Sequence, residues 1–265
     1  MMKRNLKINL DVIKDDEEEN VPKEGLCEDG VRVGSLLVSS QGLTTSQGAS
    51  YVLSLDDLVL VREEEGGFLG RGSSGSVRRA IHRVTGQAVA LKEIKVTSQA
   101  HLSEIRRELE TLHASGTRPS SQLVDFYGAF SHEGSVFIAV ECLDGSLDEL
   151  PKPVPLPVLS RITHGILLGL FYLHRTRHLI HRDLKPNNVL FNLQTGAVKI
   201  SDFGVSSYLE CTKGDANSFV GTVTYMSPER LKGEIYSYSA DIWSLGLVIA
   251  ELAVGACPYS GLRGE

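Results

Sequence analysis

Residues 179–191 read LIHRDLKPNNVLF and place charged and amide side chains between two apolar runs. The polar members include Arg182, Asp183, Lys185 and Asn188. Burying a charged group without a partner is costly, so such a cluster between buried segments needs a ligand or a counter-charge. We therefore interpret this stretch as part of a site for a charged molecule.

Length and composition describe an ordinary globular protein. The chain has 265 residues, 42% hydrophobic and 23% charged, which suits one large domain or two smaller ones. A net charge of −6 gives no support for a nucleic-acid partner or an anionic membrane surface. The four cysteines are scattered without a CxxC pair, and the N-terminus lacks the apolar core of a signal peptide. We expect a soluble, cytoplasmic protein with reduced thiols, no nucleic-acid partner and no membrane partner.

The chain changes character near residue 52 and again near residue 144. Residues 1–50 combine an acidic run at 15–19 with many Gly, Ser, Thr and Gln, which offer little apolar surface to offset ordering entropy. Short β-prone runs and an amphipathic helix at 102–113 follow. The helical segment at 158–174 is apolar on most sides, which predicts burial within a larger body. We predict an α+β fold with a flexible tail over 1–54, a β-rich N-lobe over about 55–143 and a helical C-lobe over about 144–265.

The first group of residues with a chemical signature is GRGSSGSV, from Gly70 to Val77. Glycines at the G-x-G-x-x-G spacing let backbone N–H groups approach phosphate oxygens with no Cβ in the way. The same spacing occurs in dinucleotide-binding folds and in turns that bind nothing. Strand-like sequence on both sides favours a flap over a nucleotide, because a dinucleotide fingerprint would open a helix instead.

Lys92 lies in AVALKEIKV, where strand alternation puts it on the same face as Ala90. Ala90 is small enough to let a flat base approach, and Lys92 would then point toward phosphates. A single strand lysine is usually a solvated charge, but Glu108 on the following helix is a candidate partner. A buried pair of Lys92 and Glu108 would direct the ammonium group at anionic oxygens.

The last group joins the opening stretch to the DFG sequence at residues 202–204. Asp183 is placed to accept a proton from an attacking hydroxyl, with Lys185 nearby to balance phosphate charge. Asn188 and Asp202 offer the hard oxygen ligands that Mg²⁺ prefers. An ordinary surface loop with satisfied turn residues is the other interpretation, and it does not explain so many specific residue types at fixed spacing.

From about residue 55 to its end the chain resembles the eukaryotic protein kinases, through GRGSSGSV, VALK, HRDLKPNN, DFG and SPE. The resemblance implies ATP and Mg²⁺ between the two lobes, with Asp183 as the catalytic base and Asn188 and Asp202 as metal ligands. It also implies Val140 as the gatekeeper and residues 141–143 as the hinge that contacts adenine. The residues implied to bind ATP are Leu69, Gly70, Gly72, Ser73, Ser74, Gly75, Val77, Ala90, Lys92, Val140, Glu141 and Leu143.

The loop after DFG narrows the resemblance. NSFVGT followed by YMSPER is similar to the mitogen-activated protein (MAP) kinase kinases, dual-specificity enzymes that phosphorylate a Thr and a Tyr of a MAP kinase. Thr212 and Ser218, with five residues between them, resemble the pair phosphorylated in plant-type members by an upstream kinase. A phosphate there would order the loop by pairing with Arg182, whereas unmodified loop hydroxyls usually form only turn hydrogen bonds.

The N-terminus holds a candidate docking segment. KRNLKINL places Lys3 and Arg4 before alternating Leu6, Ile8 and Leu10, which resembles the peptide by which these kinases hold their MAP kinase. Short motifs of this kind also arise by chance. The predicted partners are a MAP kinase substrate, bound through the tail, and an upstream MAP kinase kinase kinase.

The chain ends soon after the helix around Trp243, where the resemblance implies further C-lobe helices and an arginine partner for Glu229. We therefore expect a C-lobe that is incomplete in this sequence. Two alternatives to an active dual-specificity kinase stay open: a non-catalytic kinase-fold module for docking or scaffolding, and a Ser/Thr kinase of another cascade tier. Every catalytic residue is in place, which favours the active kinase.

Overall fold

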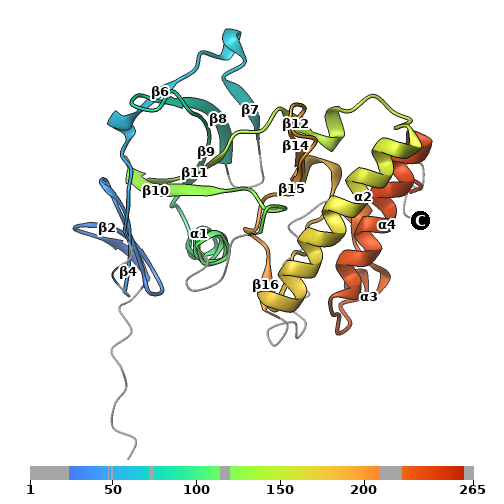
Figure 1. Cartoon of the computed structure of the whole chain (residues 1–265). Coiled ribbons are helices and arrows are strands. Elements are labelled where there is room, and N and C mark those ends of the chain that lie inside the picture. The colour runs from blue at the N-terminus through green and yellow to red at the C-terminus, as the bar shows by residue number, and fades with distance from the viewer. Residues whose placement is uncertain are drawn as a thin grey trace, which may run out of the picture.

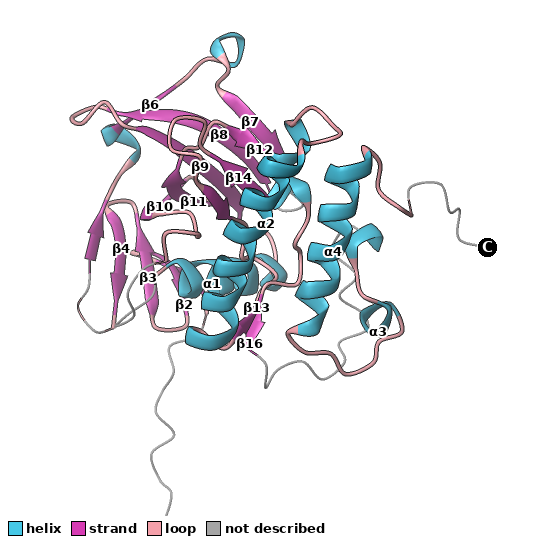
Figure 2. Cartoon of the chain, turned by 45° about the vertical axis from the view of Figure 1, so that its right-hand side comes forward, coloured by secondary structure: helices cyan, strands magenta, loops and turns pink. Residues whose placement is uncertain are grey.

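The computed structural model describes residues 24–46, 48, 50–71, 75–113, 120–208 and 223–259. Its described part has a sheet-rich N-lobe on one side and two long helices on the other (Figure 1, Figure 2), which confirms the predicted α+β, two-lobed fold. The helices are α1 (Gln99–Leu112), α2 (Leu156–Phe171), α3 (Pro228–Leu231) and α4 (Ser239–Val254). The strands are β1 (Gly25–Cys27), β2 (Gly30–Val33), β3 (Leu36–Ser39), β4 (Gly42–Thr45), β5 (Ser50–Val52), β6 (Leu58–Leu60), β7 (Phe68–Arg71), β8 (Gly75–His82), β9 (Ala88–Lys95), β10 (Phe126–His132), β11 (Ser135–Glu141), β12 (Gly145–Ser146), β13 (Leu179–Ile180), β14 (Val189–Phe191), β15 (Val198–Ile200) and β16 (Ser207–Tyr208).

The N-lobe centres on an antiparallel sheet in the order β10–β11–β9–β8–β6, with β7 paired to β8. Strand β9 is its central strand, and residues 89–92 of β9 are all buried. The β7–β8 hairpin carries the glycine-rich segment between two strands, as predicted. At Gly75 a Cβ would lie 1.6 Å from the carbonyl oxygen of Glu93, so the close approach of β8 to β9 requires glycine.

Residues 25–52 form a second antiparallel sheet, β1–β2–β3–β4–β5, which we call the N-terminal sheet. The prediction of a flexible tail over residues 1–54 is therefore wrong from residue 25 onward, and residues 1–23 lie outside the described part. A period-two signal was present, because Val31, Val33, Leu36 and Val38 alternate with less buried residues and are themselves buried. These side chains share one apolar cluster with α1 and β9–β11, so the rest of the N-lobe supplies the surface that stabilises them.

Helix α1 begins after Ser98, whose side chain accepts a hydrogen bond from the His101 N–H at 3.4 Å. Its apolar stripe of Leu102, Ile105 and Leu109 is buried, as the three-and-four spacing predicts. The stripe packs against apolar side chains of both N-lobe sheets, and Figure 1 shows α1 below β10 and beside the N-terminal sheet. The position of α1 therefore depends on both sheets.

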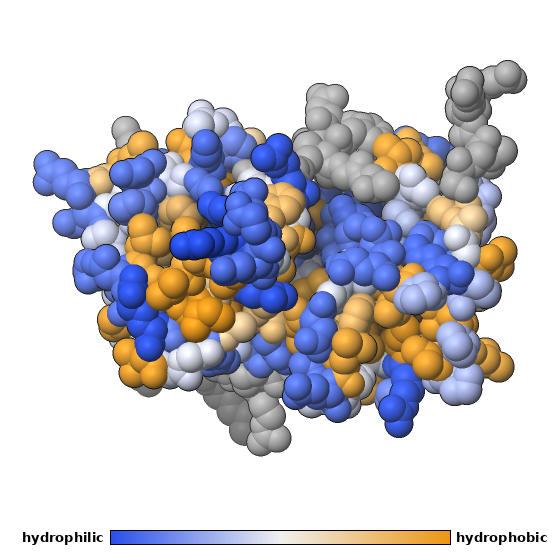
Figure 3. All heavy atoms as spheres, turned by 90° about the horizontal axis from the view of Figure 1, so that it is seen from above, coloured by the Kyte–Doolittle hydropathy of each residue, from blue (hydrophilic) through white to orange (hydrophobic). Residues whose placement is uncertain are grey.

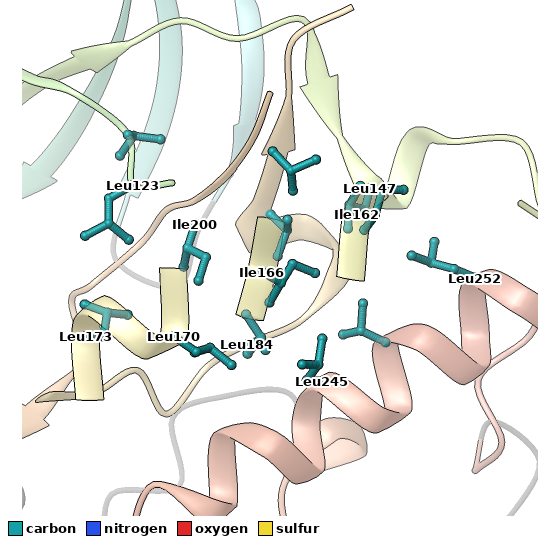
Figure 4. Close-up of a cluster of buried hydrophobic side chains, with 14 of the residues drawn as sticks. Leu123, Leu147, Ile162, Ile166, Leu170, Leu173, Leu184, Ile200, Leu245 and Leu252 are labelled. Carbon is teal, nitrogen blue, oxygen red and sulfur yellow. The ribbon is translucent and has the colours of Figure 1, made fainter. Parts of the chain in front are cut away.

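The C-lobe core forms where α2 and α4 pack together and α2 packs on β15, within the sheet β12–β14–β15. Figure 4 shows Ile162, Ile166 and Leu170 of α2 converging with Leu245 and Leu252 of α4. Leu184 and Val189, both from the stretch 179–191, are fully buried in the same core. Complete burial of one such side chain contributes about 1.5–3 kcal/mol, so the core fixes the backbone that carries the neighbouring polar residues.

Helix α2 packs into the C-lobe core through one face, so the predicted burial within a larger body does not extend to its other face. That face exposes the apolar side chains of Leu156, Val158, Leu167, Leu168 and Phe171. With the π-helical turn Tyr172–Thr176, α2 is the one described segment long and apolar enough to span a bilayer by length and composition. Packing in the C-lobe core accounts for the apolar residues of its buried face.

Candidate active site

Lys92 of β9 lies at the centre of a charged cluster. Its Nζ atom lies 2.7 Å from Oε2 of Glu108, 3.0 Å from Oδ1 of Asp202 and 3.9 Å from Oε1 of Glu104. The predicted pair of Lys92 and Glu108 is therefore present, and the DFG segment joins it. Glu104 was not predicted from the sequence, although its position one turn before Glu108 was an available signal.

Three carboxylates around one ammonium group perturb the ionisation of the cluster. Burial lowers the pKa of Lys92, but attraction to Glu108 and Asp202 outweighs burial and holds this pKa above its ordinary value. Burial raises the pKa of Glu108 to about 7, and attraction to Lys92 opposes that rise only in part. Burial also disfavours ionised Asp202, yet Lys92 holds the pKa of Asp202 below its ordinary value. The excess of negative charge favours a further cation beside Asp202.

The stretch 179–191 turns around Asp183. Lys185 Nζ lies 2.7 Å from Asp183 Oδ2, and Asn188 Nδ2 donates to the backbone oxygen of Asp183 at 2.8 Å and to Oδ2 at 2.9 Å. These contacts hold the Asp183 carboxylate in one orientation. Because the Asn188 nitrogen is engaged with Asp183, its amide oxygen is directed elsewhere. The structure thus brings together Asp183, Lys185 and Asn188, as the spacing predicts.

Asp241 of α4 holds this loop in place and was not predicted as a site residue. Its Oδ2 accepts the His181 N–H at 2.8 Å, and its Oδ1 accepts the Arg182 N–H at 2.9 Å. His174 Nε2 also lies 2.8 Å from Oδ2. Burial disfavours ionised Asp241, but hydrogen bonding from His174 and the charge and N–H groups of the loop lower its pKa below the ordinary value. The signal in the sequence was a carboxylate within a nearly apolar helix.

Asp241 also stabilises a strained backbone. Arg182 has a φ of 72°, in the left-handed region that is unfavourable for a residue with a side chain.

Asp202 has a φ of 62°, and the flanking Ser201 N–H donates to the carbonyl of Asn188 at 2.9 Å. Arg107 Nε of α1 donates to the Gly204 carbonyl at 2.8 Å. The DFG segment is therefore fixed both to the loop that carries Asp183 and to α1.

The residues predicted to surround adenine lie around the junction of the lobes, where Figure 3 shows the described surface hollowed. Ala90 pairs with Val140 across β9 and β11, and both Ala90 and Leu143 are buried. Val77 pairs with Lys92 across β8 and β9. Leu190, which was not predicted, lies on the opposite face of β14 from the fully buried Val189 and is only partly buried. It offers an apolar surface on the C-lobe side.

The side chain of Glu141 forms an ion pair within the protein. Its carboxylate pairs with Lys199 of β15, and Lys199 Nζ also lies 3.1 Å from Asp125 Oδ2. The Glu141 N–H donates to the Asp125 carbonyl at 2.8 Å. Lys199 thus ties a C-lobe strand to the segment before β10 and to the hinge. Because its carboxylate is paired, Glu141 can contact a base only through its backbone.

A cluster of arginines lies beside the loop that carries Asp183. The guanidinium groups of Arg182 and Arg230 lie 5.6 and 5.5 Å from the centre of the Tyr236 ring. Burial and the charge of Arg182 lower the pKa of Arg107 and of Arg230. Among the described atoms, the buried Nε of Arg182 has no hydrogen-bond partner. Mutual repulsion of the guanidinium groups favours the binding of an anion beside the cluster.

Several predicted residues lie outside the described part of the chain. They are Gly72, Ser73 and Ser74 of the glycine-rich turn, Thr212 and Ser218 of the loop after DFG, and residues 3–10 of the N-terminus. Leu69 and Gly70 are described and lie on β7, where the Leu69 side chain is exposed. Glu229 is partly buried, and no ion pair joins it to the residues that the structure describes.

Comparison with known proteins identifies the family. The sequence model of the protein kinase domain matches residues 64–265. Mitogen-activated protein kinase kinase 5 of Leishmania mexicana is 71% identical over 259 residues, which cover 98% of this chain and 49% of the relative. Dual specificity mitogen-activated protein kinase kinase 1 of Dictyostelium discoideum is 48% identical over 210 residues, 77% of this chain and 30% of the relative. Mitogen-activated protein kinase kinase 2 of Arabidopsis thaliana is 44% identical over 238 residues, 88% of this chain and 63% of the relative.

The chain therefore spans about half the length of the Leishmania relative, and between 30% and 63% of these three relatives. The family match falls on the two lobes that carry the charged cluster, the loop at 179–191 and the DFG segment. The chain belongs to the protein kinase family, in the branch of the mitogen-activated protein kinase kinases.

Proposed function

We propose that this chain carries the catalytic machinery of an ATP-dependent protein kinase of the MAP kinase kinase type. In this proposal the γ-phosphoryl group of ATP passes to hydroxyl groups of a Thr and a Tyr in a MAP kinase. One observation carries the proposal: Lys92 of the N-lobe contacts Asp202, and the backbone next to Asp202 is bonded to Asn188, the partner of Asp183. The names of the relatives support the substrate class.

Asp183 is the proposed catalytic base. Lys185 and Asn188 hold its carboxylate, so a hydroxyl group bound beside it would meet an acceptor in fixed orientation. In the proposed step the hydroxyl oxygen forms a bond to the γ-phosphorus, the bond from that phosphorus to the bridging oxygen of ADP breaks, and the hydroxyl proton passes to Asp183. Lys185 would offset negative charge on the transferred group.

The donor set fits the magnesium ion that protein kinases generally use with ATP. Asp202 contacts Lys92 through Oδ1, and a carboxylate has about four lone-pair sites, so it keeps acceptor capacity for a metal. The engaged nitrogen of Asn188 leaves its amide oxygen as a hard ligand. We propose Asn188 and Asp202 as the metal ligands. When bound, the ion would neutralise charge on the phosphates.

ATP would be held from both lobes. Lys92, aligned by Glu108, is the proposed contact of the phosphates and pairs across the sheet with Val77, at the end of the glycine-rich segment. The base would lie between Ala90 and Val77 on one side and Leu190 on the other, with Val140 behind it. The hinge backbone of Glu141 and Leu143 would supply the polar contacts, since the Glu141 carboxylate is already paired.

We propose Thr212 and Ser218 as sites for an upstream kinase. The arginine cluster of Arg107, Arg182 and Arg230 supports this, because a phosphate of nearly two negative charges would offset the mutual repulsion of the three guanidinium groups. Replacing both hydroxyl residues with Ala should abolish activation by the upstream kinase, while Ser237→Ala, at an exposed serine, should not. Full activation of the double variant would contradict the assignment.

The partners remain a proposal. The segment at residues 3–10 is proposed to dock on a MAP kinase through its basic and apolar side chains. Deleting residues 1–10 should weaken MAP kinase binding and leave the KM for ATP unchanged. Equal MAP kinase affinity with and without these residues would contradict the docking proposal.

We also propose a cytoplasmic location for the protein. Its support is the composition, together with Cys27 and Cys142, which form no disulfide within the described part of the chain. Fluorescence microscopy of a tagged protein, with cell fractionation, tests the location directly.

The decisive assay for the proposed function is phosphoryl transfer to a panel of MAP kinases that lack their own activity. The intact protein, treated with an upstream kinase, should label both a Thr and a Tyr of at least one of them, and Asp183→Asn should not. Binding without labelling would support the alternative of a scaffold module. Labelling confined to Ser or Thr would support a kinase of another cascade tier.

A further inference from the structure

Helix α1 contacts different parts of the molecule on opposite faces. Glu104 and Glu108 face Lys92, and Thr111 Oγ1 lies 3.1 Å from Ser206 Oγ, just after the DFG segment. Arg106 and Glu110 are each two positions from Glu108, a rotation of about 200° around the helix, so they lie on nearly the opposite side. The face of α1 that serves the charged cluster is thus distinct from the face that meets the N-terminal sheet.

The N-terminal sheet and the residue before it contact α1 along its whole length. Glu24, which precedes β1, lies 2.7 Å from Arg106 and accepts a hydrogen bond from Gln99 at 3.5 Å. In the turn between β2 and β3, a Cβ at Gly34 would lie 3.2 Å from Arg106 Nε. At the other end, Tyr51 of β5 is hydrogen-bonded to His113, directly after α1, at 2.8 Å.

Apolar packing joins these polar contacts. Val33 of β2 pairs with Leu36 of β3, at the end of the sheet next to Gly34. Both side chains are buried in the cluster that contains Ile105 and Leu109 of α1. Ile105 and Leu109 are three positions before and one position after Glu108, so a displacement of this stripe displaces Glu108 as well.

The charged cluster does not hold α1 by itself. Three carboxylates share the single ammonium group of Lys92, and two of them, Glu104 and Glu108, belong to α1. Their mutual repulsion and the burial of Glu108 favour movement of the helix away from the cluster. Contacts elsewhere on α1 therefore contribute to keeping Glu108 at 2.7 Å from Lys92, and those to the N-terminal sheet act beside the hydrogen bonds that Arg177 donates to the carbonyls of Glu110 and Thr111.

We infer that the N-terminal sheet is a brace that positions α1, and through α1 positions Glu108 against Lys92, for phosphoryl transfer. This inference rests on the proposed kinase function and makes Val33 and Leu36 positioning residues for it. The brace is part of the same polypeptide as the helix that it positions.

A matched pair of leucine substitutions in the intact protein tests the brace. Leu36 and Leu58 are both in the N-lobe and are each 3% exposed, but Leu58 belongs to a separate apolar cluster that contains no residue of α1. Leu36→Ala should lower kcat/KM for ATP about tenfold, equivalent to about 1.4 kcal/mol. It should also speed amide hydrogen exchange in residues 104–112, and Leu58→Ala should do neither. Equal effects of the two substitutions on both measurements would overturn the brace.

A double substitution separates positioning from general stability. If Leu36 acts through Glu108, Leu36→Ala should have little further effect on kcat/KM in the Glu108→Gln background. A full tenfold loss in that background would show that Leu36 acts by another route and would overturn the inference. If the unchanged protein transfers no phosphate, the proposed function fails. Hydrogen exchange in α1 then tests by itself whether the N-terminal sheet positions the helix. Faster exchange in Leu36→Ala but not in Leu58→Ala supports the brace, and equal exchange in the two variants overturns it.

Discussion

Replacing Asp241 with Asn should destabilise the loop that carries Asp183 without touching any group proposed to contact ATP. The Asp241 carboxylate accepts the N–H groups of His181 and Arg182 on separate oxygens. Asn has one acceptor oxygen, so its amino group would face one of these donors. The substitution therefore removes a charge-assisted hydrogen bond and places two donors opposite each other.

The structure sets the size of the effect. A hydrogen bond to a charged group contributes about 1.5–3 kcal/mol, and the second bond weakens when its acceptor becomes neutral. Both bonds also hold Arg182 at a φ of 72°, a conformation that costs about 1–3 kcal/mol for a residue with a side chain. We expect the free energy of unfolding to fall by about 2–4 kcal/mol. Relaxation of Arg182 should also displace Asp183 and lower kcat at least tenfold, by about 1.4 kcal/mol or more.

Urea denaturation of the intact protein measures the stability change. Trp243 is the single tryptophan of the chain and lies two positions after Asp241, so its fluorescence reports on α4. Asp144→Asn is a matched control, because Asp144 also accepts a backbone N–H, from Leu193 at 2.7 Å, but is exposed. It should change the free energy of unfolding by less than about 1 kcal/mol.

Two results would refute the reasoning. One is a free energy of unfolding for Asp241→Asn that matches the Asp144→Asn control. The other is loss of stability with unchanged kcat, which would separate the strain at Arg182 from the position of Asp183.

Three further predictions concern other contacts of the site. Since Glu108 has a pKa of about 7 and pairs with Lys92 only when ionised, kcat/KM for ATP should rise with pH around 7, and Glu108→Gln should remove that rise. Lys199→Met leaves Glu141 and Asp125 without their cation, so the melting temperature and ATP affinity should fall, whereas Lys199→Arg should retain most of both. Gly75→Ala places a Cβ against the Glu93 carbonyl and should lower the melting temperature by several degrees, whereas Gly70→Ala, with open space around the new Cβ, should not.

Each of these has a clear contradictory outcome. A flat pH profile for the unchanged protein would show that Glu108 is ionised throughout the range. Wild-type ATP affinity for Lys199→Met would show that the hinge does not depend on that ion pair. Equal melting temperatures for the two glycine variants would show that β8 approaches β9 less closely than described.

The parts of the site that could be predicted are those encoded by short sequence spacings. Asp183, Lys185 and Asn188 lie within one loop, so their meeting follows from the local fold of residues 179–191. Lys92 was predicted from strand alternation, and Glu108 from its place on the helix that follows. In each case the chemistry needed only one element, or two that follow one another, to be placed correctly.

The parts that were missed depend on contacts between distant segments. Asp241 accepts hydrogen bonds from the N–H groups of Arg182 and His181, which lie 59 and 60 positions before it in the chain. A sequence does not show which backbone groups a side chain will contact. A flexible tail was predicted in place of the N-terminal sheet, because the apolar side chains that complete its cluster come from α1 and β9–β11, far along the chain. Glu141 was predicted as a hinge residue, but its pairing with Lys199 spans 58 positions and shows only in the folded chain.

Binding of ATP with and without Mg²⁺, measured by calorimetry on the intact protein and on Asp202→Asn, tests the central claim most directly. The claim is that Lys92, Asn188 and Asp202 together bind one magnesium-bound triphosphate. We predict that Mg²⁺ strengthens ATP binding to the unchanged protein and that Asp202→Asn loses most of this gain. No binding of ATP to the unchanged protein, or an equal gain from Mg²⁺ in Asp202→Asn, would contradict the claim.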